Sequence, residues 1–387
     1  MGDTIRSLAI VSPFYPPHVG GIERYAQEFA RAAADLGLSV NVVTTDAVAK
    51  PIETVEDSRL RVLRLPAYNV PIMGSYYPIA FGWRKANEFL RCDVVMAHTR
   101  FFMTTLAAAT ATARMGKRIC VVDHGAGPLR SSPRALALAS LAYEHAATAA
   151  LKRLAARFFA VSAASANWLR RFGIANAPVL PNSVASLATP PHQQVLGDRK
   201  KIVVFYAGRL LAEKGLLELI EGVELLSGRG YAIEVRIAGE GPLAGALRRR
   251  AVNSAHVIYL GRIPHDAVEH ELTNATVFVN PSKLPEGSPT AVLEAGLAAL
   301  PVITTPFGGS AELIHHGRTG WIIPSSDPEN IASALEEVIS NPEEASRRGL
   351  ALFRYGQENY TWPSTVRSFL GYMEAAAPSH DQTVTAQ

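Results

Sequence analysis

Short hydrophobic runs rich in β-branched residues alternate with helical patterns along the first half of the chain. An amphipathic pattern spans 21–37, and Ala-rich helical stretches, notably 134–156, separate the later runs. The runs themselves predict strands at residues 7–12, 39–45, 60–65, 93–98, 118–124 and 157–162. Strands that alternate with helices are typical of a parallel sheet covered by helices on both faces.

The same alternation resumes after a polar, proline-containing stretch at 181–201, which predicts a linker. The expected strands are then 201–208, 233–239, 256–261, 275–282 and 301–305, with helices starting at Gly215 and Pro242 and a third over 289–299. The pattern predicts two doubly wound, Rossmann-like α/β domains at 1–185 and 186–360, and a final helix at about 361–376 that packs back on the first. Ligands of such sheets bind beyond the carboxyl ends of the strands, so two facing domains would enclose a cleft.

Composition supports this reading and excludes several classes of protein. The chain has 387 residues, of which 48% are hydrophobic and 19% charged, so it can form two packed cores and is not a disordered chain. No run of 18 consecutive apolar residues occurs, so no spanning helix is expected. Two cysteines, Cys92 and Cys120, are too few for a disulfide scaffold, and a reducing cytoplasm is the expected setting.

Positive charge is concentrated in the first half. The net charge is +4, whereas residues 1–185 carry 21 basic and 12 acidic side chains, a balance of +9. This asymmetry favours an anionic partner such as the inner face of a membrane or a phosphorylated acceptor, with an ordinary solvated surface as the alternative. Nucleic acid is the least favoured partner, because the basic residues are spread out and no reading motif accompanies them.

Two glycines, Gly20 and Gly21, stand between the first strand and the first helix. Without Cβ atoms they let a ligand approach the backbone, and the start of a helix favours an anion or a sugar oxygen. The GxGxxG spacing of a nicotinamide-binding loop is absent. The alternative is a plain strand–helix turn.

Two cations, Arg209 and Lys214, follow the strand at 201–208. Their place at the carboxyl end of a strand, just before a helix, suits a diphosphate. The alternative is an exposed basic loop.

The segment 281–303 carries the most information, because two carboxylates flank a turn into a helix. Glu286 and Glu294 are separated by seven residues. Pro289 is expected in the first helical turn, where the N–H groups of Thr290 and Ala291 can point at phosphate. Glu294 would lie one turn into the helix and can accept hydrogen bonds from a ribose diol, while Glu286 can reach an attached sugar. Alternatively, Glu294 is a surface residue and Glu286 a companion of the helix start.

Taken together, five segments resemble a known family. The segments AGRL…EKG, AGEGP (238–242), LGR (260–262), EGSPTAVLEA and PFGGSAELI are similar in order and spacing to those of retaining glycosyltransferases of family 4, which have the GT-B fold. The resemblance covers nearly the whole chain. It implies an enzyme of the hexosyltransferase type that moves a sugar from a UDP- or GDP-sugar to a carbohydrate or lipid-linked acceptor in polysaccharide or glycolipid assembly.

The resemblance also implies roles for individual residues. In the second domain, Arg209 and Lys214 would hold the diphosphate and Glu286 the donor sugar. Glu294 would bind the ribose, and the backbone of Arg262 and Ile263 would meet the base. Pro289 and Thr290, at the start of the helix, would also contact the donor.

In the first domain, Gly20 and Gly21 would contact donor phosphate or sugar across the cleft. His124, at the end of a strand, matches the histidine that the family places near the donor sugar. A structural histidine is the alternative for His124, and His98 is expected to be structural or on the acceptor side. The loops 66–83 and 125–134 are expected to shape the acceptor site.

No DxD motif occurs in the chain, so no catalytic metal or other cofactor is expected. Arg209, Lys214 and the helix start near Thr290 would then stabilise the leaving diphosphate. The sequence departs from the family where Ser183 replaces a glycine and Ser288 follows Gly287 in place of an aromatic residue, which leaves the donor sugar open. A sugar-nucleotide epimerase and a catalytically inert sugar-nucleotide-binding module are the competing functions.

Overall fold

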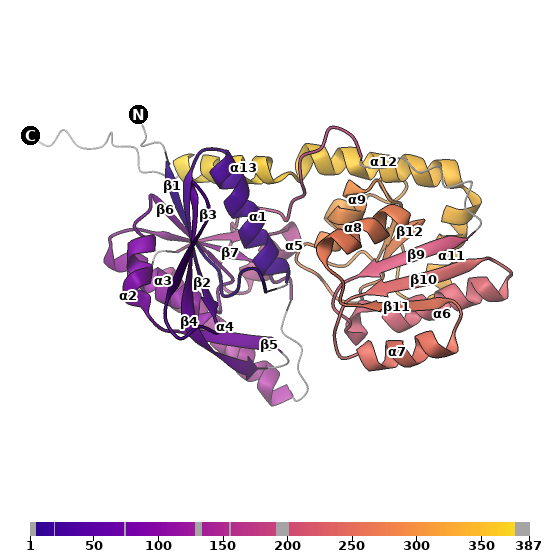
Figure 1. The fold of residues 1–387 in the computed structure, drawn as a ribbon, viewed down its shortest axis with the longest axis horizontal. Helices are drawn as coiled ribbons and strands as arrows, with labels where there is room; N and C mark the ends of the chain where they lie inside the picture. Colours follow the sequence, from indigo (N-terminus) through magenta and orange to yellow (C-terminus); the bar gives the residue numbers. More distant parts are fainter. Residues whose placement is uncertain are drawn as a thin grey trace, which may run out of the picture. The chain divides into compact units, whose positions relative to one another are not determined.

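The computed structural model describes residues 5–18, 20–72, 75–127, 134–154, 156–190 and 201–375 (Figure 1). The chain forms two compact units, each with its own sheet. Unit 1 holds the chain up to Val161, Ser165–Pro181 and the segment from Trp362 onward, and unit 2 holds Ser162–Ala164 and Asn182–Thr361. Part of the predicted linker, 191–200, and parts of the two predicted acceptor loops, 73–74 and 128–133, lie outside the described residues.

The sheet of unit 1 has a parallel centre and antiparallel additions. Its strands run in the order β3-β4-β2-β1-β6-β7-β8, and β5 extends part of β4 as a hairpin. Along the spatial order β4-β2-β1-β6-β7-β8, each strand is parallel to its neighbour. Strands β3 and β5 are antiparallel to β4. The bounds are β1 Ser7–Val11, β2 Ser39–Asp46, β3 Ile52–Asp57, β4 Leu60–Ile72, β5 Ser75–Ala80, β6 Val94–His98, β7 Ile119–Asp123 and β8 Arg157–Ala160.

The hydrophobic pattern predicts a single short strand at 60–65 in this region, and this prediction is wrong for β3, β5 and the second half of β4. Strand β3 is exposed along its whole length, so it lacks the apolar alternation of a half-buried strand. Pro66, Pro71 and Pro78 interrupt the hydrophobic runs within β4 and β5. Beyond Pro66, the described part of β4 pairs only with β5, so each of these two segments has a free side on which proline is tolerated.

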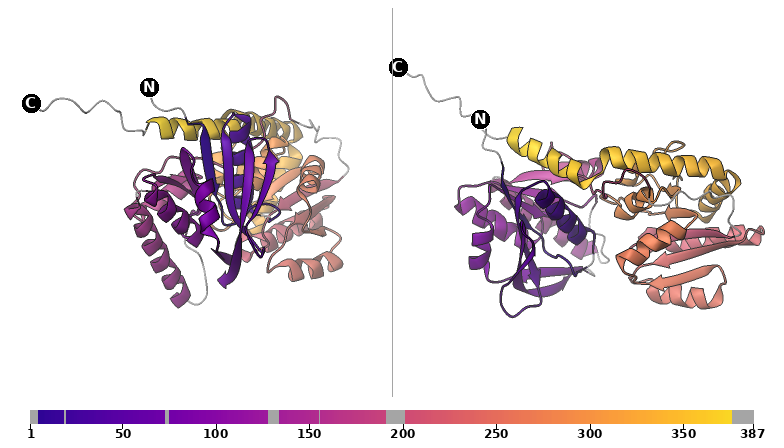
Figure 2. Two further views of the ribbon diagram at one scale, coloured as in Figure 1. Left: turned by 60° about the vertical axis from the view of Figure 1, so that its left-hand side comes forward. Right: turned by 45° about the horizontal axis from the view of Figure 1, so that its top comes forward.

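Helices cover both faces of this sheet. Leu8 and Ile10 of β1 pack with α1 and α13, whereas the alternate residues Ala9 and Val11 pack with the other helices. The C-terminal helix α13 lies along α1 (Figures 1 and 2), and the rings of Phe29 and Phe369 pack edge to face at 5.6 Å. The helices are α1 Gly21–Asp35, α2 Trp83–Phe89, α3 Met103–Arg114, α4 Arg134–Arg153, α5 Ala163–Arg170 and α13 Trp362–Ala375.

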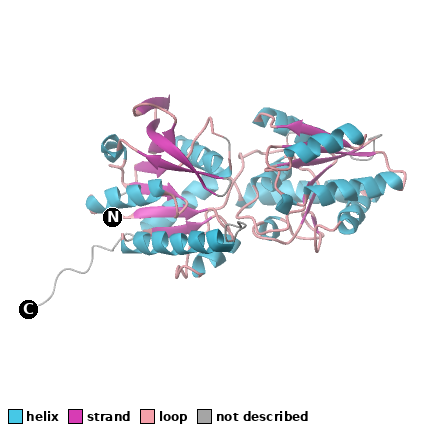
Figure 3. Cartoon of the chain, turned by 90° about the horizontal axis from the view of Figure 1, so that it is seen from below, coloured by secondary structure: helices cyan, strands magenta, loops and turns pink. Residues whose placement is uncertain are grey.

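The sheet of unit 2 is parallel throughout, in the order β11-β10-β9-β12-β13-β14. The central strand β9 turns Val204 and Tyr206 to one face and Val203 and Phe205 to the other. Both faces are covered by helices (Figure 3). The strands are β9 Ile202–Ala207, β10 Ile233–Ala238, β11 Val257–Gly261, β12 Val277–Asn280, β13 Val302–Thr304 and β14 Trp321–Ile322.

The helices of unit 2 divide between the two faces. Residues of α6, α7 and α11 pack with Val204, and residues of α8, α9 and α12 pack with Phe205. The bounds are α6 Leu216–Gly228, α7 Ala244–Asn253, α8 His265–Asn274, α9 Thr290–Leu297, α10 Ser310–Leu313, α11 Pro328–Ser340 and α12 Pro342–Asn359.

The strand order of unit 2 reverses at β9, which has β10 on one side and β12 on the other. In doubly wound sheets, the loops that leave the two strands at such a point diverge and leave a crevice at their carboxyl ends. The loops that follow β9 and β12 carry Arg209 and Lys214 and the segment 281–289, respectively. The topology therefore brings these predicted site segments to one edge of one sheet.

Candidate active site

The central contact of the site is an ion pair between Lys214 and Glu286. The Nζ of Lys214 lies 2.5 Å from Oε2 of Glu286, and the two side chains are only 14% and 20% exposed. Asn280, the last residue of β12, donates from Nδ2 to Oε1 of Glu286 at 3.2 Å. Both carboxylate oxygens of Glu286 thus have partners. Two residues to which the sequence assigned different parts of a ligand are in direct contact, so an anion bound by Lys214 would compete with Glu286.

A glycine allows the Lys214 loop to pack on the segment after β12. Lys214 ends a 3₁₀ turn over Ala212–Lys214, and Gly215 follows with φ of 69°. A Cβ at Gly215 would lie 2.2 Å from the carbonyl oxygen of Pro281, which no side chain can accommodate. The backbone N–H of Lys283 also donates to the carbonyl of Glu213 at 2.8 Å. The two loops are therefore joined through their backbones.

The AGEGP segment supports the Arg209 loop in the same way. A Cβ at Gly239 would lie 1.9 Å from the carbonyl oxygen of Gly208, and one at Gly241 would lie 2.6 Å from that of Leu210. Both glycines also have positive φ. The buried hydroxyl of Tyr206 donates to the carbonyl of Arg209 at 3.2 Å. The backbone of Arg209 is thus held from two sides, while its side chain is exposed.

The turn before α9 is held by a second glycine loop. Glu286 and Gly308 form a backbone bridge, and the N–H of Gly309 donates to the carbonyl of Glu286 at 2.9 Å. Gly308 has φ of 63°, and a Cβ there would lie 2.1 Å from the carbonyl oxygen of Glu286. The PFGG segment therefore presses against the backbone of Glu286. Sequence reasoning used this segment only as part of the family resemblance and did not assign it this role.

Helix α9 begins at Thr290, and Pro289 is its N-cap with φ of −73° and ψ of 100°. The sequence placed Pro289 inside the first helical turn. In the structure it lies one position earlier, because its extended backbone precedes the helix. Within the described parts of the chain, no side chain forms a capping hydrogen bond to this helix. The N–H groups of Thr290 and Ala291 therefore occupy the first two helical positions, which have no partner within a helix.

Asn182 is a second residue that sequence reasoning did not assign to the site. Its Nδ2 donates to the carbonyl of Ser288 at 2.7 Å and lies 3.4 Å from Oγ1 of Thr290. It thereby ties the start of α9 to the segment that enters unit 2. The available signal was its position directly before Ser183, the residue at which the sequence departs from the family.

The other predicted residues of unit 2 occupy nearby element ends. Glu294 lies one turn into α9 and is partly buried. Arg262 and Ile263 follow the last residue of β11, Gly261, and Arg262 is exposed. β11 is separated from β9 by β10. Arg262 and Ile263 therefore lie at the same edge of the sheet as the loop after β9, two strands away from it.

In unit 1, Gly20 is the N-cap of α1 and Gly21 its first residue. Gly20 has extended backbone, with φ of −177°, so its conformation does not itself require glycine. A Cβ at Gly20 would meet the movable carboxylate of Glu23, whereas one at Gly21 would enter open space. Among the described residues, no heavy atom outside this turn lies within 4 Å of that position.

His124 follows the last residue of β7 and contacts a second histidine. Its Nε2 lies 3.0 Å from Nδ1 of His98, the last residue of β6. The ring of Tyr25, from α1, meets both imidazoles edge to face at 5.0 and 5.3 Å. Burial lowers the pKa of His124 to about 3 and, together with the neighbouring His124, holds the pKa of His98 well below its ordinary value. Both rings are therefore neutral at physiological pH.

A buried charge cluster adjoins this pair, and no sequence pattern predicted it. Arg100 is fully buried and contacts the carboxylates of Asp123 and Glu144, which are also buried. Its guanidinium lies 4.0 Å from the centre of the Phe172 ring. Burial raises the pKa of both carboxyls, and the Arg100 charge opposes this rise. Asp123 directly precedes His124, so the cluster adjoins the predicted site.

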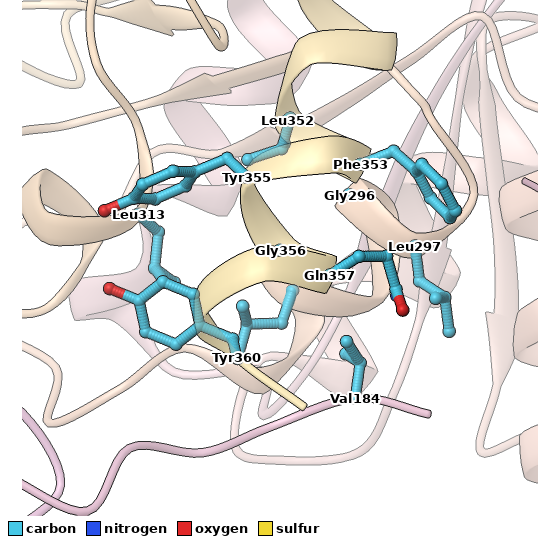
Figure 4. A pocket seen from close by; sticks show the side chains of 11 residues that line it. Val184, Gly296, Leu297, Leu313, Leu352, Phe353, Tyr355, Gly356, Gln357 and Tyr360 are labelled. Atoms are coloured by element: carbon cyan, nitrogen blue, oxygen red, sulfur yellow. The ribbon is translucent and has the colours of Figure 1, made fainter. Parts of the chain in front are cut away.

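Among the described residues, no group of three or more His, Cys, Asp or Glu side chains is placed to hold a metal ion. A small apolar pocket in unit 2 lies between α9, α12 and the segment around Val184 (Figure 4). Tyr355, Gln357 and Tyr360 line it, and none of its residues is a predicted site residue.

Comparison with known proteins identifies the family of this chain and proteins of the same fold. A family model described as "Glycosyl transferases group 1" matches residues 190–351, and one described as "Glycosyltransferase Family 4" matches residues 19–185. An uncharacterized glycosyltransferase of Methanocaldococcus jannaschii is 22% identical over 94% of this chain and 96% of its own. A GDP-mannose-dependent phosphatidylinositol monomannoside mannosyltransferase of Mycolicibacterium smegmatis is 28% identical over 43% of this chain and 46% of its own.

Solved structures match over nearly the whole chain. Sucrose-phosphate synthase from Thermosynechococcus elongatus has a TM-score of 0.73 at 18% identity, covering 97% of this chain and 100% of its own. Anabaena HepE in complex with UDP has a TM-score of 0.70 at 16% identity, covering 95% and 100%. At these identities the likeness establishes the fold.

Proposed function

Since this chain belongs to the group 1 and family 4 glycosyltransferases, we propose that it moves a hexose from a nucleotide sugar to an acceptor, with retention of anomeric configuration and without a catalytic metal ion. The predictions of this family and of its GT-B fold are confirmed by the matches to both halves and to the whole fold. The observation that carries the proposal is the Lys214–Glu286 pair beside the uncapped start of α9, at the point where the strand order of unit 2 reverses.

The donor diphosphate is assigned to Arg209, Lys214 and the N–H groups at the start of α9. Each would offset the negative charge that develops on the leaving phosphate. Before the ligand arrives, the Lys214 side chain is held by Glu286 and the backbone of Arg209 by its neighbours. Glu286, released from Lys214 by the diphosphate, would then accept hydrogen bonds from hydroxyls of the donor sugar. In this arrangement the ion pair holds both side chains in position for their separate partners.

The remaining assignments follow the resemblance. Glu294 is proposed to accept hydrogen bonds from the ribose, and the backbone at Arg262 and Ile263 to meet the base. In unit 1, His124 is proposed to contact the donor sugar, and the Gly20–Gly21 turn a phosphate or sugar oxygen. Retention without a carboxylate nucleophile would proceed by departure and attack on one face, with the leaving phosphate oxygen accepting the proton of the acceptor hydroxyl.

The donor nucleotide is proposed to be UDP or GDP. HepE was solved with UDP and with UDP-glucose, and the mycobacterial relative is named as GDP-mannose-dependent. The fold-level likeness does not choose between them, and Ser288 occupies the position where relatives often carry an aromatic residue. Both classes therefore enter the test.

A donor screen tests the proposed function. The full chain is incubated with a panel of UDP-, GDP- and ADP-sugars, with and without a lipid-linked acceptor, and free nucleotide and glycosylated product are measured. Transfer with retained configuration in one donor series is the expected result. Binding of a nucleotide sugar without release would favour an inert binding module, and interconversion of the sugar within the nucleotide would favour an epimerase.

Chelation is expected to leave turnover largely intact. The chain has no DxD motif, so the leaving diphosphate is stabilised in this proposal by fixed cations and backbone N–H groups. Initial rates are measured with the best donor before and after dialysis against EDTA. Loss of activity that Mg²⁺ or Mn²⁺ restores would overturn the metal-independent assignment.

The acceptor is proposed to lie on unit 1, near the β4–β5 hairpin within the predicted loop 66–83. Tyr68 and Phe81 are 75% and 47% exposed, and their rings meet edge to face at 5.6 Å. Exposed aromatic faces of this kind pack against sugar rings or lipid chains. Carbohydrate and lipid-linked acceptors both fit this surface.

A basic edge of unit 1 is proposed to bind the inner face of an anionic membrane. It consists of residues at the ends of α3 and α4 and at the starts of the neighbouring strands β7 and β8: Arg114, Lys117, Arg118, Lys152, Arg153 and Arg157. No described helix is long and apolar enough to cross a bilayer. Attachment would therefore be peripheral, at about 1 kcal/mol for each basic residue near the surface at low salt.

Liposome flotation tests this attachment. The chain is expected to float with anionic but not neutral vesicles, less so as added salt shortens the screening length. Exchange of Arg114, Arg118 and Arg153 for Gln should abolish flotation. The same charge change in unit 2, at Arg248, Arg249 and Arg250, is the matched control and should have no effect. A chain that stays unbound with anionic vesicles at low salt would favour a solvated surface and a soluble acceptor.

A further inference from the structure

The histidine pair of unit 1 has an unequal hydrogen-bonding pattern. His98 is fully buried, and among the described residues its Nε2 has no hydrogen-bond partner. Its other ring nitrogen, Nδ1, lies 3.0 Å from Nε2 of His124. His124 itself is partly exposed. His98 is thus completely enclosed, His124 is partly exposed as a residue, and a single contact joins their rings.

This pattern decides which nitrogen carries each proton. A neutral imidazole has one N–H donor and one acceptor nitrogen. If His124 donated from Nε2, His98 would carry its own proton on Nε2, a buried donor without an acceptor. If His98 donates from Nδ1, only an acceptor lone pair remains unpaired there, which is less costly. The second arrangement makes His124 an acceptor at Nε2 and places its proton on Nδ1.

The backbones on both sides of the pair are fixed. The Oγ1 of Thr105 donates to the carbonyls of His98 at 3.1 Å and Thr99 at 2.8 Å, and Thr99 has the rare positive φ of 66°. On the other strand, Asp123 directly precedes His124, pairs with the backbone of β8 and contacts the buried Arg100 through its carboxylate. The hydrogen bond between the rings therefore joins two anchored strand ends and sets the orientation of the His124 ring.

We propose that His98 is a positioning residue that holds His124 as its Nδ1–H tautomer, so that His124 presents Nδ1–H as a hydrogen-bond donor to a hydroxyl of the donor sugar. This inference rests on the proposed role of His124 in sugar transfer. A neutral donor of this kind suits a sugar hydroxyl, which can accept it, and has no charge to offer the diphosphate. His98 acts through His124 and does not touch the substrate.

Three substitutions at His98 separate a positioning role from a packing role. An asparagine amide nitrogen occupies nearly the place of imidazole Nδ1, whereas a glutamine amide occupies that of Nε2. His98→Leu removes the donor, His98→Asn keeps it, and His98→Gln keeps a polar group that cannot reach His124. We expect kcat to fall by about 10- to 100-fold in His98→Leu and His98→Gln, with a smaller change in the donor KM, and to return to within about threefold in His98→Asn.

Nitrogen-15 NMR of histidine-labelled full-length protein reads the tautomer directly. In the wild-type chain, Nε2 of His124 should resonate as an unprotonated nitrogen and Nδ1 as a protonated one. The signals are assigned by their loss in His124→Gln. In His98→Leu the two tautomers of His124 should both be populated.

A protonated Nε2 on His124 in the wild-type chain would overturn the inference, and so would wild-type kcat in both His98→Leu and His98→Gln. Failure of the proposed function looks different. In that case no donor is turned over by the wild-type chain, while the NMR spectrum still reports the tautomer of His124. If His98→Leu does not fold, His98→Gln and the wild-type spectrum still decide the question.

Discussion

Replacing Arg209 or Lys214 by alanine is expected to lower turnover by about 10²–10³-fold without unfolding the protein. In the proposed function, both cations stabilise the leaving diphosphate, and the loss of one preorganised stabiliser of developing charge raises a barrier by about 3–4 kcal/mol. Arg209 is exposed and Lys214 contacts Glu286 in a partly buried pair. Neither side chain is part of a hydrophobic core, so folding should survive each change.

The measurement is kcat and kcat/KM with the best donor, together with thermal unfolding of each variant. Lys283→Ala is the matched control, because Lys283 lies on the same loop as Glu286 but pairs with Glu218 on α6. This control should stay within about threefold of the wild-type rate. If Arg209→Ala and Lys214→Ala both turn over donor nearly normally, the leaving-group site is assigned to the wrong residues.

Lys214 has a second effect that the same variants reveal. Without it, the Glu286 carboxylate loses its cation and retains the hydrogen bond from Asn280. Donor binding in Lys214→Ala should therefore weaken through Glu286 as well as through the lost contact with phosphate. Lys214→Ala combined with Glu286→Gln should then cost less than the sum of the single changes, because the two residues act as a unit.

The sequence was sufficient for the main architecture because the hydrophobic pattern in most of the chain has one dominant period. Strand β9, for example, alternates between two buried faces, and α1 carries a regular apolar stripe. The pattern failed where burial no longer decides the structure. Strand β3 is exposed, and prolines interrupt β4 and β5. These strands are held by backbone hydrogen bonds, and their sequences lack the hydrophobic alternation that predicts a strand.

For the candidate site, the sequence supplied residues but not their contacts. Lys214 and Glu286 were assigned separately because they are far apart in the chain, and only the strand order brings β9 next to β12. The close approach of Gly308 to Glu286 is a backbone contact and depends on tertiary structure. The burial of Arg100 could not be predicted for a different reason. In a sequence, a buried arginine looks like any solvated basic residue.

Arg100→Met is expected to cost about 3–5 kcal/mol in the free energy of unfolding. The change leaves the buried carboxyls of Asp123 and Glu144 without their cation, and uncompensated buried charge is strongly destabilising. Urea unfolding of the full chain, followed by circular dichroism, measures the loss. Arg171→Met is the control, because Arg171 is an exposed arginine over the Trp168 ring and should contribute about 0.5 kcal/mol or less.

The double variant Arg100→Met with Glu144→Leu distinguishes a lost charge balance from lost packing. If the cost of the single change comes from stranded carboxyls, removing one of them should restore about half of the stability or more, because a buried ion pair can be replaced by apolar groups at little cost. If the double variant is less stable than Arg100→Met, the Arg100 side chain is needed for its packing on Phe172 instead. Asp123 stays in both variants, because it directly precedes His124. If the double variant recovers its stability but turns over donor more slowly than the wild-type chain, the Arg100–Asp123 contact also helps to position His124.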